Sequence, residues 1–81
     1  MNLDPNLSRE DAMWLITEFK PKMGYRVDHH NMHNIWLKAR RIITGQEVGM
    51  SDCACHFLSF VKITNSLFGQ YEMQIKEVAH S

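Results

Sequence analysis

Two clusters of histidine and cysteine are the residues in this chain best suited to metal chemistry. They are His29, His30 and His33 in one cluster, and Cys53, Cys55 and His56 in the other. Structural zinc takes four such ligands in a tetrahedron, and His29 with His33 forms a two-ligand half-site on one face of a helix. The residue types therefore raise zinc as the one cofactor to consider.

The spacing within and between the clusters argues against such a site. On a helix, Cys53 and Cys55 point about 200° apart, so a shared ion requires the helix start to unwind. We expect the two helices that begin at these clusters to pack as an antiparallel hairpin, which separates the clusters by about 25 Å of helix rise. We therefore expect no cofactor, and zinc binding stays an alternative hypothesis.

Cysteine catalysis is the second chemistry that these residues suggest. Cys53 falls in the first turn of an expected helix, where free amides and the helix dipole stabilise a thiolate, and His56 is a nearby base. However, no third side chain is placed to orient His56, and Cys53 belongs to an apolar helical stripe, where a small buried residue is the commoner outcome. We expect the protein not to be an enzyme.

Length and charge narrow the function further. The chain has 81 residues, nine Lys and Arg against nine Asp and Glu, and a formal net charge of zero. This length supports a single domain over residues 1–81, and the balanced charge disfavours a general polyanion binder. There is no secretory signal or transmembrane run, and the closely spaced cysteines suit a reducing compartment. We expect a cytoplasmic protein, in the host cytoplasm or the virion if it is viral.

Two shorter helices are expected in the first half of the chain. Ser8 is a suitable N-cap, and Pro21 disfavours helical geometry at the residue before it, so the first helix should cover about 8–20. Asp28 and Gly45 are the corresponding start and stop signals of a second helix over about 28–44. Each helix carries one apolar stripe at helical spacing.

One long helix is expected in the second half. Ser51 is a third N-cap, and an apolar stripe continues from there without a change of phase to Val78. Gly69 costs about 1 kcal/mol in a helix interior, yet it lies off the stripe. We therefore predict a single helix over about 51–79 packed on the two shorter ones, in an all-α, three-helix arrangement.

A basic group of side chains makes nucleic-acid binding an alternative function. The candidate residues are Lys20, Lys22, Tyr25, Arg26, Lys38 and Arg40. Cations and an aromatic ring near a helix start attract phosphate through the free amides of the first turn. The zero net charge and the spread of these residues around the second helix weigh against this interpretation.

Two large apolar residues lie outside the stripes and indicate a contact surface. Trp14 and Leu37 fall on the sides of their helices away from the stripes, with His30 and Arg41 beside Leu37. Aromatic, apolar and arginine side chains are enriched at the energetic centres of protein interfaces; the competing interpretation is that Trp14 is simply core. We predict an interaction or assembly module that binds another protein or itself as a homo-oligomer, a style typical of phage or mobile-element accessory proteins.

Overall fold

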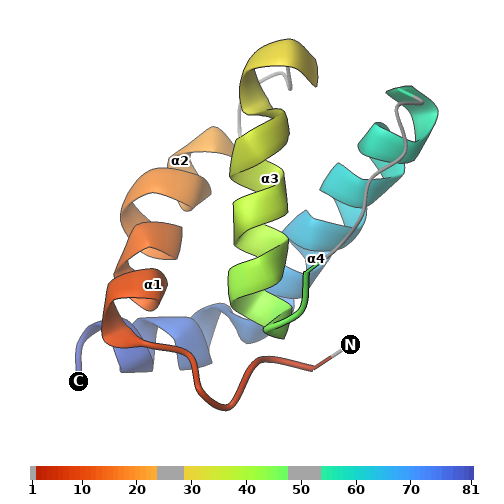
Figure 1. Cartoon of the computed structure of the whole chain (residues 1–81). Helices are drawn as coiled ribbons and strands as arrows, with labels where there is room; N and C mark the ends of the chain where they lie inside the picture. The colour runs from red at the N-terminus through yellow and green to blue at the C-terminus, as the bar shows by residue number, and fades with distance from the viewer. Residues whose placement is uncertain (1, 24–28, 48–53) are drawn as a thin grey trace.

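The chain folds as three helical segments, and the residues that the structure describes contain no strand (Figure 1). The computed structural model describes residues 2–23, 29–47 and 54–81. The first segment comprises α1 (Arg9–Trp14), the π-helical turn η1 (Leu15–Phe19) and α2 (Lys20–Lys22), and it is followed by α3 (His29–Thr44) and α4 (Ala54–Ala79). α4 packs against both shorter segments, which confirms the expected all-α, three-helix arrangement.

The first segment begins as expected but continues past its expected end. The Ser8 hydroxyl accepts a hydrogen bond from the amide of Asp11 at 3.1 Å, as an N-cap does. The prediction that Pro21 ends the helix is wrong, because helical conformation runs through it to Lys22. In η1 the Lys20 amide bonds to the Leu15 carbonyl, five residues back. This wider turn gives the proline ring room that a regular α-helical turn denies it.

The expected antiparallel hairpin of the second and third helices is also wrong. In Figure 1, α3 and α4 both begin in the upper part of the view, descend, and come together lower down. They meet where Arg40 Nε donates to Thr64 Oγ1 at 3.0 Å. Residues 45–53 separate the two helices, and nine residues can span about 30 Å, more than the roughly 24 Å rise of α3. A connection of this length permits α4 to begin at the same end of the molecule as α3.

α4 is one helix from Ala54 to Ala79, so the predicted continuity through Gly69 is confirmed. A Cβ atom added at Gly69 would meet nothing within 4 Å, which shows that this glycine faces open space. The helix curves along its length in Figure 1. Inside it, the buried Thr64 hydroxyl donates to the Phe60 carbonyl at 2.7 Å, a type of bond that often bends helices. The expected cap Ser51 lies outside the described residues.

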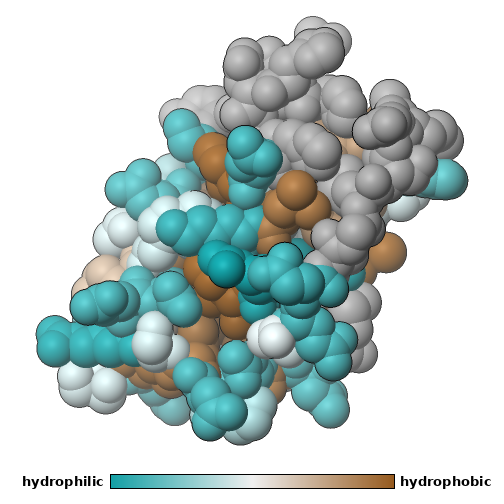
Figure 2. Space-filling view, viewed as in Figure 1, coloured by the Kyte–Doolittle hydropathy of each residue, from teal (hydrophilic) through white to brown (hydrophobic). Residues whose placement is uncertain are grey.

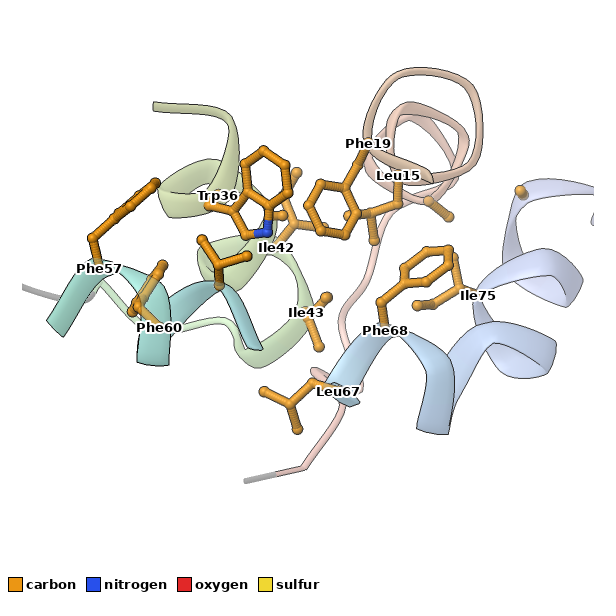
Figure 3. Packing of buried hydrophobic residues seen from close by; sticks show 14 residues of the cluster. Leu15, Phe19, Trp36, Ile42, Ile43, Phe57, Phe60, Leu67, Phe68 and Ile75 are labelled. Atoms are coloured by element: carbon orange, nitrogen blue, oxygen red, sulfur yellow. The ribbon is translucent and has the colours of Figure 1, made fainter. Parts of the chain in front are cut away.

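Three aromatic rings from different helices form the centre of the core (Figure 3). The Phe19 ring lies 5.4 Å from Trp36 and 5.6 Å from Phe68, both edge to face. All three side chains are fully or almost fully buried. Edge-to-face pairs contribute about 0.5–1.5 kcal/mol beyond burial, so Phe19 ties the first segment to both other helices.

The N-terminal segment around Asp4 is hydrogen-bonded to the end of α3, a feature that helical periodicity does not predict. We call this segment the N-terminal strap. The Asp4 amide donates to the Ile43 carbonyl at 2.7 Å, and the Asp4 carboxylate accepts from the Asn6 amide at 2.9 Å. Gly45 follows α3 with φ of +73°, the left-handed conformation expected of a glycine after a helix. A Cβ there would come within 2.8 Å of the Asp4 side chain. A glycine at position 45 therefore suits both the left-handed conformation after α3 and the close approach of the Asp4 side chain.

A surface ion cluster joins the first segment to α4. Glu72 accepts from Lys20 and, at 3.1 Å, from Lys76. These hydrogen bonds, that from Lys20 first, hold the pKa of Glu72 below its ordinary 4.5, and the bond to Glu72 raises the pKa of Lys20 above 10.5. The cluster is solvent-exposed, so its contribution is modest and sensitive to salt.

The pH dependence of stability follows from these shifts. A carboxylate with a lowered pKa stabilises the fold above its unfolded pKa, and that contribution is lost as the pH falls through the folded value. We expect Glu72→Gln to be less stable than wild type at pH 7 and to approach wild type at pH 2–3. Above pH 10.5 the difference should shrink again as Lys20 loses its proton. Urea unfolding at the three pH values measures this; a difference that is constant with pH would contradict it.

Candidate interaction face

Trp14 lies at the edge of the core, between the two alternatives that its sequence position leaves open. It is half-buried, and its ring stacks on Phe19 with centroids 6.4 Å apart and planes 16° from parallel. The Lys38 ammonium from α3 lies 4.4 Å from the centre of the same ring. Trp14 therefore both contacts the core and, on its outer side, is covered by the Lys38 ammonium in a cation–π contact.

Leu37 and Arg41 lie beside Lys38 on α3. Together with Glu47 these three residues line a shallow hollow of about 230 Å³. Leu37 is half-buried, whereas the Arg41 side chain is 51% exposed. Leu37 and Arg41 are one helical turn apart, so they share a side of the helix. The contact of Lys38 with Trp14 joins this hollow to α1, and we name Trp14, Leu37, Lys38 and Arg41 the Trp14 face.

The ion pair that Arg41 and Glu47 form at the hollow is weak. Arg41 Nη1 lies 3.8 Å from Glu47 Oε1, and the Glu47 side chain is 86% exposed. Pairs of this kind typically contribute about 0–1 kcal/mol. The Arg41 guanidinium can therefore exchange Glu47 for another carboxylate at little cost. Figure 2 shows hydrophobic atoms in small patches among hydrophilic ones, without one broad apolar surface in this view.

The structure places only part of the predicted contact residues. Trp14, Leu37 and Arg41 are gathered on one side of the molecule through Lys38. Position 30 belongs to α3, but the side chain of His30 lies outside the described part of the chain. Lys38, which the sequence suggests for phosphate binding, instead covers the tryptophan.

The basic residues proposed for nucleic-acid binding differ in their burial and in the contacts that they make. Arg40 is 5% exposed; it donates to Thr64 Oγ1 and, at 3.4 Å, to the Phe60 carbonyl, and it lies 4.3 Å from the Phe60 ring centre. Burial lowers the pKa of Arg40 from its ordinary value. Lys20 pairs with Glu72 and Lys22 is half-buried, while Tyr25 and Arg26 lie outside the described residues. Of the described members of this set, Arg40 and Lys20 therefore contact α4, and Lys38 lies over Trp14.

The helix starts that carry the histidine and cysteine clusters lie at the same end of the molecule, not at opposite ends. α3 begins at His29 and α4 begins at Ala54, both in the upper part of Figure 1. His56 is exposed. The side chains of His29, His33, Cys53 and Cys55 lie outside the described part. Within residues 2–23, 29–47 and 54–81, no group of three or more described His, Cys, Asp or Glu side chains could hold a metal ion.

Arg40 is the structural residue that the sequence interpretation missed. The sequence places it among the basic residues proposed for nucleic-acid binding. A different signal was present: Arg40 follows Trp36 by four residues, which puts it at the edge of the buried stripe. A long side chain there can reach the partner helix, as Arg40 reaches Thr64.

Comparison with known proteins assigns the chain to no family. No protein-family model, curated protein or solved structure gives a significant match to the chain. Among the described helices, none combines the length and the apolar character that crossing a bilayer requires.

Proposed function

We propose that this protein is a small non-enzymatic interaction or assembly module whose Trp14 face binds another protein. The observation that carries the proposal is the hollow lined by Leu37, Lys38, Arg41 and Glu47, continued onto the Trp14 ring by Lys38. Tryptophan and arginine are among the residues that contribute most to binding energy at protein interfaces, and here both lie beside the half-buried Leu37.

The groups that cover this face can be displaced without unfolding. Lys38 is a flexible side chain whose contact with an aromatic ring contributes about 0.5–1 kcal/mol at an exposed site. Its movement would uncover Trp14, while the stacking of that ring on Phe19 would hold it in place. A partner that brings a carboxylate to Arg41 and an apolar side chain to Leu37 would satisfy both ends of the hollow.

Charge insertion at Leu37 tests the proposal. Leu37→Glu and Arg41→Glu should each reduce capture of a specific partner from the source lysate by at least about tenfold, the effect of losing an interface anchor. Gln74→Glu, an exposed position on α4, is the matched control and should capture the partner as wild type does. Circular dichroism checks that the variants remain helical. Equal capture by all four proteins would refute the assignment of the face.

Structural zinc is the second candidate, because the course of the helices removes the objection to it. α3 and α4 start at one end of the molecule, so the separation expected from a hairpin does not apply. If zinc is structural, untagged protein should carry near-stoichiometric metal, and chelation should lower the melting temperature. Metal-free protein with an unchanged melting temperature would exclude this role.

Nucleic-acid binding has less support from the geometry. Of its proposed residues, Arg40 is committed to the α3–α4 contact and Lys20 to Glu72. If it occurs, affinity should fall steeply with salt concentration, and no salt-dependent binding should survive charge reversal at Lys22. We place the interaction module in the cytoplasm, and its assignment to a phage or mobile element is a hypothesis that rests on size and composition alone.

A further inference from the structure

The outer side of α4 differs from the rest of the described surface in its apolar content. The large hydrophobic residues that are exposed in the described part of the chain are Leu58, Ile63 and Met73, at 55%, 46% and 76%. All three belong to α4. Single exposed apolar residues are ordinary, and Met73 is the most exposed of the three.

Gly69, which leaves a gap in the helix surface, and Met73, whose side chain projects from it, lie one turn apart on α4. Gly69 has open space where a side chain would be, and Met73 follows it by four residues, so both lie on one face of the helix. Glycine in a helix interior lowers helix stability, and no atom of the described residues would lie within 4 Å of a Cβ placed there. A second helix lying across Gly69 would make use of the gap.

Two opposite charges on this face, Lys62 and Glu77, could pair with each other's counterparts in a reversed copy, while a third charge there, Lys76, is already paired with Glu72. Lys62 lies two turns before Gly69, Glu77 lies about two turns after it, and both are exposed. Neither forms an ion pair with the other residues that the structure describes. A parallel copy would place Lys62 beside Lys62 and Glu77 beside Glu77, whereas an antiparallel copy brings Lys62 of one chain within reach of Glu77 of the other.

We propose that α4 binds a second copy of this chain in antiparallel orientation, with Met73 of each copy at the Gly69 gap of the other. Such a two-fold contact is self-complementary, because each residue pair occurs twice. The zero net charge gives no long-range repulsion between copies. The contact shares no residue with the Trp14 face, so the two surfaces can be tested independently.

The strength of the contact follows from its size. A stable interface buries about 800 Å² on each partner, and a contact along part of one helix covers less. We therefore expect a dimer with a dissociation constant on the order of 100 µM. Sedimentation equilibrium from about 10 µM to 1 mM should show the mass rising from 9.5 kDa toward twice that value.

Variants on this face distinguish the proposed contact from any other. Met73→Asp should weaken association at least about tenfold, while Gln74→Asp, the adjacent exposed position, should leave it unchanged. Lys62→Glu should weaken it, and Lys62→Glu combined with Glu77→Lys should restore it. Gly69→Ala should raise the melting temperature, because alanine favours helix, yet weaken association, a pair of opposite effects that loss of folding cannot produce.

Two results would overturn the proposal. One is a wild-type mass of 9.5 kDa over the whole concentration range. The other is association of Met73→Asp that equals that of Gln74→Asp, which would place any dimer contact elsewhere.

Discussion

A Phe19→Ala variant should lose about 3–5 kcal/mol of unfolding free energy, the usual cost of deleting a buried aromatic ring. Phe19 is fully buried and contacts Trp14, Trp36 and Phe68, which come from each of the three helical segments. Small domains have a total stability of about 5–15 kcal/mol. The variant should therefore be partly or wholly unfolded at room temperature.

Urea unfolding followed by circular dichroism measures this effect. Glu18→Ala is the matched control, because Glu18 precedes Phe19 and is exposed, and it should change stability by about 0.5 kcal/mol or less. A loss for Phe19→Ala that is no larger than the control loss would mean that the three segments do not share this aromatic centre.

The second large effect is expected at Arg40. Arg40→Ala removes the hydrogen bonds to Thr64 Oγ1 and to the Phe60 carbonyl of α4, together with the contact over the Phe60 ring. Hydrogen bonds to a charged group contribute about 1.5–3 kcal/mol, so we expect the variant to lose about 2–3 kcal/mol. The substitution should weaken the packing of α3 against α4 without changing the helical conformation of either helix.

The neighbouring arginine provides an internal control for this prediction. Arg41 is half-exposed and pairs only weakly with Glu47, so Arg41→Ala should cost about 0.5 kcal/mol or less. Chemical denaturation of the two variants under one condition compares them directly. Equal losses would show that burial of Arg40 does not stabilise the fold.

The sequence predicts the helices well because their signals are local. The Ser8 cap, the stop at Gly45 and the unbroken stripe past Gly69 each depend on a few neighbouring residues, and all three match the structure. Pro21 shows the limit of a local rule. A proline ends a regular α-helix, but a single π-turn in η1 accommodates it.

Helix direction was not predictable in the same way. α4 could run back alongside α3 or begin at the same end of the molecule as α3. Which of these occurs depends on the connection at residues 45–53, and helical periodicity contains no information about that connection. The same limit applies to Lys38 and Arg40. Both are cations near the end of one helix, and only the packing of α1 and α4 decides that one covers Trp14 and the other is buried against Thr64.

The candidate face was partly predictable. Trp14 and Leu37 stand out because they fall outside the stripes, and the structure brings them together through Lys38. The half-burial of Trp14 was not predictable, because it depends on stacking with Phe19 five residues later, within the π-helical turn.

An amide NMR titration tests the central claim, binding through the Trp14 face, most directly. Isotope-labelled protein is titrated with the purified partner that wild type captures and Leu37→Glu does not. We predict saturable shifts centred on the amides of Trp14, Leu37, Lys38 and Arg41, with little change at Gln74. Shifts confined to α4, or no saturable shifts at all, would contradict the claim.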